Sequence, residues 1–149
     1  MPNDLTSASG ATPGYVLDDQ IGFILRQAAQ RHSVIFQKLS PYDLTPTQFA
    51  VLIRLHQMGE CSQNELGRRT AMDVATIKGV VDRLRRKGFL NIRPDPQDRR
   101  RTLLSISETY KDIAPALHEA GTDITAATLD PLAPAERKEL LRLLRKISD

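Results

Sequence analysis

Arginine and lysine residues are concentrated in one short stretch of the chain, where their chemistry suits a polyanion. Between Arg83 and Arg101 stand eight basic residues and two acidic ones, Asp95 and Asp98, so this segment carries a net charge of +6. The whole 149-residue chain carries only +3, which leaves −3 for everything else. A basic stripe on a compact module is typical of polyanion binding, and duplex DNA is the commonest such partner.

The other reactive side chains are too few or too scattered for catalysis or for a metal site. No nucleophile, base and stabilising group converge in a recognisable motif. The histidines His32, His56 and His118 fall in separate predicted helices without ligand spacing. Cys61 is the single cysteine, which excludes an intramolecular disulfide and a cysteine-rich zinc site. We therefore expect a protein that is not an enzyme and that binds no metal and no cofactor.

The N-terminal residues predict a flexible tail rather than a targeting signal. Residues 1–14 are polar and lack the basic and apolar regions of a secretory signal. No run of the sequence approaches the roughly 18 apolar residues that a membrane helix needs. We expect a cytoplasmic protein without a membrane partner.

The elements that must position the basic stripe are mostly helical. Residues 18–39 carry apolar side chains at spacings of three and four, which predicts an amphipathic helix ended by Ser40 and Pro41. Thr45, Pro46 and Gln48 supply a cap, a first-turn proline and a capping-box partner for a second helix that ends at Met58 and Gly59.

Two further helices are close enough to form a helix-turn-helix. Ser62 and Glu65 have the spacing of a capping box, and a short helix to about Thr70 follows. Asp73 caps a longer helix that Gly88 terminates. Its inward face is expected to consist of Ile77, Val80, Val81 and Leu84. Two helices joined by so short a turn are typical of this DNA-binding motif.

A β-hairpin is expected to follow, with a last pair of helices behind it. Segments 89–93 and 102–106 are rich in β-formers, and the charged, proline-containing loop 94–101 between them should project as a wing. Ser107 is expected to cap a long helix to about Leu129, kinked at Pro115, before a final helix opens at Pro134. The fold class is thus mainly α with a small β-hairpin wing.

The second helix of the motif predicts which residues would read DNA. Recognition helices contact base edges with their first turns, and Val74, Ala75, Thr76 and Lys78 occupy those positions. Farther along, arginines are better suited to phosphates. An arginine at the tip of the wing fits a narrow minor groove, and Asp98 would hold Arg100 or a neighbour in place. The alternatives are a solvated helix face and a solubilising loop. The expected phosphate and wing contacts are Arg83, Arg85, Arg86, Arg99 and Arg100.

The wing sequence resembles the MarR family of bacterial transcription regulators. Residues 98–107 follow that family's D-x-R-x-x-x-L-x-[LI]-[TS] pattern, and VDRLRRKGFL before it also matches. The resemblance implies a single domain over residues 15–149, with dimerisation helices at about 15–40 and 108–149 and a winged helix-turn-helix at about 45–107. It further implies a homodimer, a pseudopalindromic operator and an effector pocket between the dimerisation helices and the winged module.

Two sensing mechanisms and one rival function stay open. Arg26, His32 and Phe36 could line a pocket for an aromatic acid or its coenzyme A thioester, and the alternative for His32 is a core or dimer-interface residue. Cys61 precedes a helix, where a thiolate is favoured, but no basic residue adjoins it. A nonspecific architectural DNA protein would also be basic, yet it would gain nothing from the reading face formed by Val74, Ala75 and Lys78.

Overall fold

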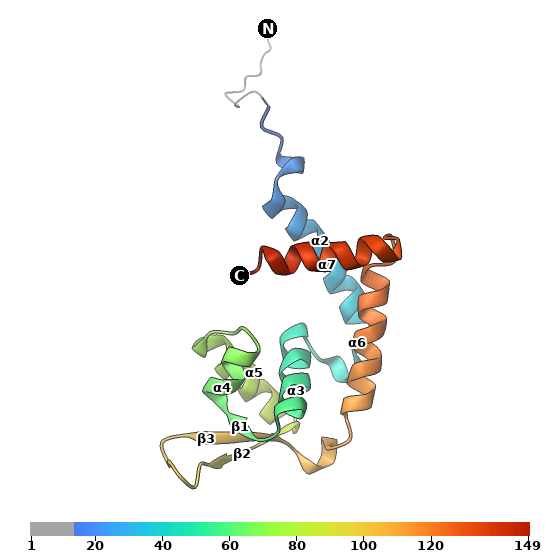
Figure 1. Cartoon of the computed structure of the whole chain (residues 1–149). Coiled ribbons are helices and arrows are strands. Elements are labelled where there is room, and N and C mark those ends of the chain that lie inside the picture. The colour runs from blue at the N-terminus through green and yellow to red at the C-terminus, as the bar shows by residue number, and fades with distance from the viewer. Residues whose placement is uncertain (1–13) are drawn as a thin grey trace. The chain divides into compact units, whose positions relative to one another are not determined.

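The elements follow the predicted order, with four short additions. The computed structural model describes residues 14–149, so the predicted tail lies outside the described residues except for Gly14. Figure 1 shows the order of the elements from blue to red. They are η1 (Leu17–Asp19), α2 (Ile21–Leu39), η2 (Pro41–Asp43), α3 (Pro46–Met58), β1 (Cys61–Ser62), α4 (Gln63–Arg69), α5 (Val74–Arg86), β2 (Leu90–Pro94), β3 (Thr102–Ile106), η3 (Glu108–Tyr110), α6 (Ala114–Thr128) and α7 (Pro134–Lys146).

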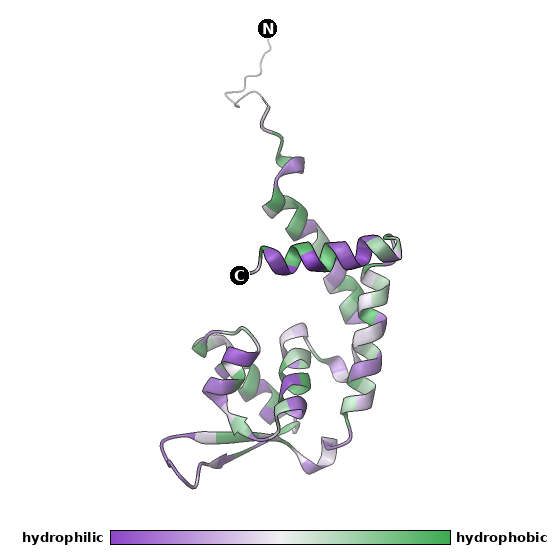
Figure 2. Ribbon diagram, in the orientation of Figure 1, coloured by the Kyte–Doolittle hydropathy of each residue, from purple (hydrophilic) through white to green (hydrophobic). Residues whose placement is uncertain are grey.

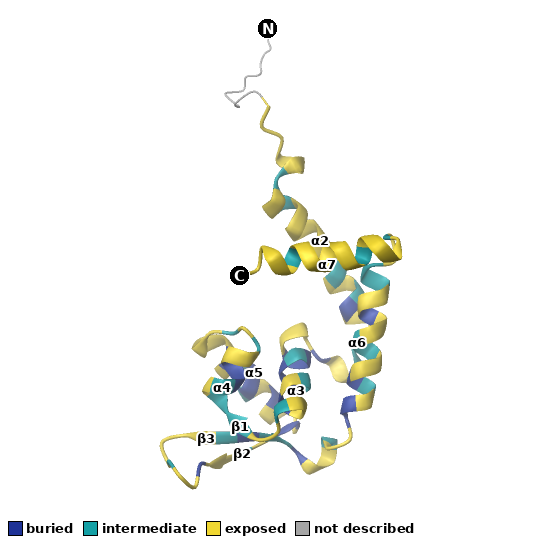
Figure 3. Cartoon of the chain, in the orientation of Figure 1, coloured by how far each residue is buried: buried dark blue, intermediate teal, exposed yellow. Residues whose placement is uncertain are grey.

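The chain divides into two units, Met1–Val34 and Ile35–Asp149, and the boundary falls inside α2. In the described part of the first unit, apolar side chains of α2 are solvent-exposed, including Ile21 and Leu25. Figure 3 shows this part of the helix mainly as exposed surface. The second unit contains the rest of the elements and the hydrophobic core.

The sheet has three antiparallel strands in the order β1-β3-β2. β2 and β3 form the predicted hairpin, with Leu90 opposite Ile106. β1 pairs with the other edge of β3, where Cys61 lies opposite Leu104. β1 was not predicted, because two residues are too few to show an alternating pattern and their pairing partner lies far along the chain.

Side-chain caps set the starts of α3, α4 and α5. The backbone N–H of Gln48 donates to Thr45 Oγ1 at 3.3 Å, and the backbone N–H of Thr45 donates to Gln48 Oε1 at 3.2 Å, which confirms the predicted capping box. At α4 the backbone N–H of Glu65 donates to Ser62 Oγ at 3.2 Å. The Glu65 carboxylate, however, pairs with Arg68 on the next turn, so only half of that box forms.

The region after the wing differs from the prediction. Ser107 does not cap a helix with its side chain; its hydroxyl donates instead to the carbonyl of Gly88 at 2.7 Å. The short η3 follows, and α6 begins only at Ala114. Pro115 therefore lies in the first turn of α6, where a missing N–H costs nothing and the ring fits the helix. The predicted kink at Pro115 is wrong for this reason.

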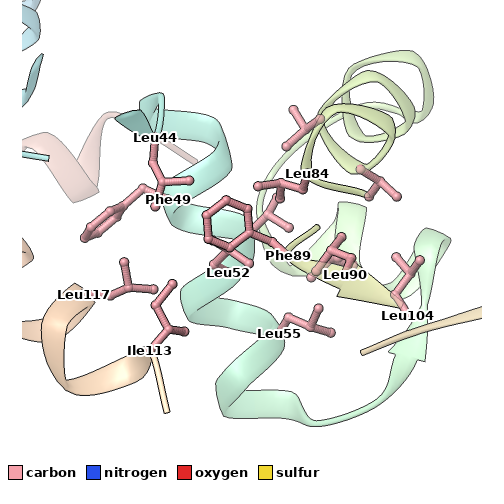
Figure 4. Packing of buried hydrophobic residues seen from close by; sticks show 14 of the residues in the cluster. Leu44, Phe49, Leu52, Leu55, Leu84, Phe89, Leu90, Leu104, Ile113 and Leu117 are labelled. Atoms are coloured by element: carbon pink, nitrogen blue, oxygen red, sulfur yellow. The ribbon is translucent and has the colours of Figure 1, made fainter. Parts of the chain in front are cut away.

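The core joins the helix-turn-helix, the wing and α6. Leu52 and Leu55 of α3, Leu84 of α5 and Leu104 of β3 are each at most 1% exposed. Figure 4 shows these leucines together with Phe89, Leu117 and their neighbours, which come from α3, α5, the sheet and α6. The recognition helix and the wing thus pack on one hydrophobic cluster, which fixes their relative orientation.

α7 leaves apolar side chains uncovered. Leu140, Leu141, Leu143 and Ile147 are between 37% and 61% exposed, and no residue of this helix is buried. Figure 2 shows hydrophobic and hydrophilic residues alternating along the helix. Uncovered apolar surface of this kind marks interaction sites. Within residues 14–149, no helix is long and apolar enough to cross a membrane.

Candidate nucleic-acid interface

One side of the recognition helix α5 packs in the core, and the side chains at its start are exposed to solvent. Asp73 caps the helix by accepting a hydrogen bond from the backbone N–H of Thr76 at 2.7 Å, and this bond lowers the pKa of the Asp73 carboxyl. Ile77, Val80, Val81 and Leu84 are buried, as predicted. Val74 is 71% exposed although it is apolar, and Ala75 and Thr76 are exposed beside it. An apolar side chain in solvent at this position suits contact with a thymine methyl group.

Lys78 extends from the same face but has an acidic partner. Its Nζ lies 3.0 Å from Asp82 Oδ2, one turn along the helix, and both side chains are solvent-exposed. Hydrogen bonding by Lys78 lowers the pKa of the Asp82 carboxyl. An exposed pair of this kind is weak, so guanine acceptors can compete with Asp82 for the ammonium group.

α4 carries a glycine where it packs closely against the start of α5. A Cβ atom at Gly67 would lie 3.2 Å from Ile77 Cγ2 and 3.3 Å from the carbonyl oxygen of Met72. Both contacts are tighter than ordinary packing distances. Gly67 therefore allows α4 to approach α5 closely, and this approach sets the angle at which the recognition helix is presented.

The end of α5 is basic and exposed. Arg83, Arg85 and Arg86 occupy its last turn and point into solvent. Lys87, at the cap, instead donates to the carbonyl of Asp43 at 3.2 Å and to Gln48 Oε1 at 3.1 Å. The three arginines are placed for phosphate contacts, whereas Lys87 ties the end of the recognition helix to the segment before α3.

The tip of the wing is ordered by Asp98. Its carboxylate accepts hydrogen bonds from Arg100 Nε at 3.1 Å, Arg100 Nη2 at 3.3 Å and the Arg100 backbone N–H at 3.1 Å. The side-chain bond with Arg100 is the main reason that the pKa of Asp98 lies below its usual value. The predicted pairing of Asp98 with Arg100 is confirmed. Among residues 14–149, no carboxylate pairs with Arg99, which stands beside this pair.

One residue of the wing loop is buried, contrary to the expectation that the whole loop projects. Asp95 is 8% exposed, and its carboxylate accepts a hydrogen bond from the backbone N–H of Gln97 at 2.9 Å. Arg101 Nε lies 3.4 Å from Asp95 Oδ2, and the Asp95 N–H donates to the Arg101 carbonyl at 3.0 Å. A buried carboxylate is tolerated because these groups satisfy it. The wing loop is thus a turn stabilised by the interactions of Asp95, and its tip carries exposed arginines.

The predicted effector residues do not all lie in one unit. Arg26 and His32 belong to the first unit, where the Arg26 guanidinium carbon lies 5.3 Å from the ring centroid of Phe23. His32 is half-buried. Phe36 belongs to the second unit and is buried, with its ring edge-on to Phe49 at a centroid distance of 5.4 Å. A pocket formed by all three residues therefore stays a prediction.

The surroundings of Cys61 argue against a redox role. It lies on the short strand β1 and is half-buried. Burial, with smaller contributions from the carboxylates of Glu65 and Glu60, raises the pKa of its thiol, and the nearby Arg69 offsets this only in part. A thiol that keeps its proton is a poor nucleophile toward oxidants.

The structure also brings together residues that the sequence left apart. His56 of α3 and His118 of α6 have ring centroids 6.2 Å apart, because the two helices pack side by side. His118 lines an open groove of about 580 Å³ whose walls are mostly apolar and which also contains Arg137. The groove could not be predicted from the spacing of residues in the sequence, because its residues come from α3, α6 and α7. Among residues 14–149, no three histidine, cysteine or acidic side chains cluster as a metal site would require.

Comparison with known proteins agrees with this architecture. The MarR family profile matches residues 44–102. The HTH-type transcriptional repressor NicR of Pseudomonas putida is 38% identical over 136 residues, which cover 91% of this chain and 86% of that protein.

Solved structures extend the match over nearly the whole chain. A probable transcriptional regulator from Pseudomonas aeruginosa is 48% identical, with a TM-score of 0.84 and coverage of 89% of this chain and 99% of that one. BpsR from Bordetella bronchiseptica, described with a mechanism for regulation of its DNA binding by 6-hydroxynicotinic acid, is 39% identical, with a TM-score of 0.83 and coverage of 91% and 97%. The chain is therefore a member of the MarR family of winged helix-turn-helix transcription regulators.

Proposed function

We propose that this protein is a sequence-specific repressor that acts as a homodimer and is released from DNA by a small aromatic acid or its coenzyme A thioester. The observation that carries the DNA-binding part is the exposed first turn of α5. Val74, at 71% exposure, Ala75 and Lys78 form a face with no role in the core. Such a mixture of apolar and basic groups suits base edges, whereas phosphate binding alone needs only charge.

The wing and the end of α5 supply the remaining contacts. Arg99 or Arg100 enters the minor groove, and Asp98 orients Arg100 for this purpose. Arg83 and Arg86 hold phosphates at the far end of the recognition helix. Hydroxyl-radical footprinting of the DNA upstream of the gene tests this arrangement. Two protected half-sites about one helical turn apart are expected for a twofold dimer, and uniform, unpositioned protection would contradict it.

The effector class is supported by one relative and by the groove beside α6. The DNA binding of BpsR is regulated by 6-hydroxynicotinic acid, whereas NicR, a transcriptional repressor, supports repression and not the effector class. The groove offers apolar walls for an aromatic ring together with the guanidinium of Arg137, which suits a carboxylate. Arg26, His32 and Phe36 remain the candidate ligand contacts on α2. The proposal includes a single domain over residues 15–149, with dimerisation helices at about 15–40 and 108–149 and a winged helix-turn-helix at about 45–107.

A displacement assay tests the effector. Labelled operator DNA is bound by the protein and titrated with 6-hydroxynicotinic acid or with its coenzyme A thioester, with benzenesulfonamide as an uncharged aromatic control. We expect one of the two compounds to lower the anisotropy, and Arg137→Met or Arg26→Met to raise the concentration that is needed. Retention of the DNA by the wild-type protein at saturating amounts of both compounds would refute this effector class and leave DNA binding intact.

The redox alternative receives less support than the ligand alternative. The Cys61 thiol is half-buried and its pKa is raised. The architectural alternative predicts equal affinity for all duplexes, and competition with random DNA separates it from the proposed function.

A further inference from the structure

A polar hollow of about 280 Å³ lies between the start of α4 and the base of the wing. The unpredicted strand β1 creates it, because Ser62 pairs with Leu103 and so brings the first turn of α4 beside the residues that precede β3. Neither α4 nor the wing loop alone would form such a recess. Its lining residues are Ser62, Gln63, Asn64, Arg68, Arg100, Arg101 and Thr102.

The lining is cationic and hydrogen-bonding. Three of its seven residues are arginines, and the other four carry hydroxyl or amide groups. The side chains of Arg68, Arg100 and Arg101 are 68%, 91% and 56% exposed, so none of them is used up in packing. An oxyanion in the recess would lie close to all three guanidinium groups, which attract it.

Each arginine forms an ion pair with a carboxylate that does not line the hollow. Arg68 pairs with Glu65, Arg100 with Asp98 and Arg101 with Asp95. A guanidinium carries five N–H donors in a fork, so it can keep its carboxylate and still donate to a second oxyanion.

We propose that this hollow binds one backbone phosphate of the DNA duplex in each half-site, with Arg68 and Arg101 as its charged donors. The inference rests on the proposed DNA-binding function. The tetrahedral phosphate presents several acceptors at once, which matches converging guanidinium, hydroxyl and amide donors. The recess belongs to the same packed module as α5 and the wing, so a phosphate held there fixes the register of the recognition helix without reading sequence.

The first test compares Arg68→Ala with Lys111→Ala. Lys111 forms the same kind of exposed i,i+3 pair, with Glu108, but lies outside the lining of the hollow and outside α7. We expect Arg68→Ala to weaken operator and random DNA by the same several-fold factor and to reduce the slope of log K against log salt by about 1. Lys111→Ala should change neither quantity. An unchanged slope for Arg68→Ala would overturn the proposal.

The second test identifies the phosphate. Single uncharged methylphosphonate linkages are moved along the operator, and binding of the wild-type protein is expected to fall several-fold at one linkage in each half-site. In Arg68→Ala that linkage should no longer matter, while losses at other linkages persist. Identical profiles for the two proteins would contradict the assignment.

A free anion could occupy the hollow through the same interactions as a DNA phosphate, and a test with inorganic phosphate separates the two cases. If inorganic phosphate raised the melting temperature of the wild-type protein but not of Arg68→Ala, while both bound DNA with the same salt slope, the hollow would be a free-anion site and the DNA assignment would be wrong. Absence of any preference for operator over random DNA would instead refute the proposed function. The comparison of salt slopes on random duplex would still decide about the hollow.

Discussion

At the scale of single residues, the proposed function depends on side chains that the core does not need. Val74 remains apolar in solvent, and Lys78 is balanced by Asp82 rather than buried. Both sit in the first turns of a helix whose opposite side is fixed by buried residues such as Val81 and Leu84. The division of α5 into a packed side and an open side could be predicted from its sequence because helical periodicity alone determines it.

Replacing Lys78 by alanine should reduce discrimination more than affinity. If Lys78 donates to a guanine, its loss lowers the preference for operator over random DNA by about 1–3 kcal/mol. The measurement is anisotropy with both duplexes at one salt concentration. Lys111→Ala is the matched control, because Lys111 forms an exposed pair with Glu108 outside the reading face. Equal losses for operator and random DNA would assign Lys78 to a phosphate instead.

Cys61 should react slowly. Its raised pKa means that the thiol stays protonated at neutral pH, so alkylation by iodoacetamide should accelerate only at a pH above that typical of free cysteine. The rate is measured by mass spectrometry of the folded protein. Cys61→Ser should bind operator and respond to peroxide as the wild type does. A peroxide response that disappears in Cys61→Ser would revive the redox alternative.

At the scale of elements, the wing is a turn stabilised by carboxylates. Asp98 holds the tip through Arg100, and the buried Asp95 holds the base together with Arg101. The pKa of Asp98 is lower in the folded state than in the unfolded chain. Its pairing with Arg100 therefore stabilises the wing fully at a pH above the pKa of the unfolded chain, which is near 3.9. This stabilisation is lost as the pH falls through the lower pKa of the folded state.

Hydrogen exchange in the wing should follow this pH dependence. The backbone N–H of Arg100 bonds to the Asp98 carboxylate, so its protection should persist near pH 5 and fall below about pH 3.9. In Asp98→Asn the protection of this N–H should already be reduced at neutral pH. Asp112→Asn, at an exposed position before α6, serves as the control. Full protection of Arg100 in Asp98→Asn would show that the side chain does not order the tip.

Local signals predicted some elements well and others poorly. The starts of α3 and α5 were predictable because Thr45 and Asp73 cap them through contacts within three residues. β1 was not, because its two residues depend on distant pairing with β3. Pro115 illustrates a third case: its effect depends on where the helix begins, and η3 shifts that beginning to Ala114.

The candidate site, like the fold, was only partly predictable from the sequence. Its reading face follows from the periodicity of α5, and the Asp98–Arg100 pair follows from sequence proximity. The hollow beside Arg68 and the groove that contains His118 and Arg137 were not predictable, since packing between separate elements creates both.

At the scale of the whole molecule, uncovered apolar side chains argue for a second copy. Leu140 and Leu143 of α7 are exposed in the second unit, and Ile21 and Val34 of α2 are exposed in the first. Burying such surface is favourable by roughly 25 cal/mol per Å². A twofold assembly would cover it and present two recognition helices at once.

A charge on α7 should therefore separate the subunits. Leu143→Glu places a carboxylate among side chains that a partner would bury, so the protein should sediment as a monomer and bind operator weakly. Lys138→Gln, at an exposed position of the same helix, makes the same change of one charge unit and serves as the control. Analytical ultracentrifugation reports the outcome. A Leu143→Glu dimer as stable as the wild type would exclude this part of α7 from the interface.

The central claim is that the open face of α5 reads a particular DNA sequence. It is tested most directly by an anisotropy titration against the DNA upstream of the gene in the presence of excess random duplex. Binding that survives the competitor in the wild-type protein, and that loses this resistance in Lys78→Ala, is the predicted result. Displacement of the wild-type protein by random duplex in proportion to its concentration would contradict sequence-specific recognition and favour architectural binding.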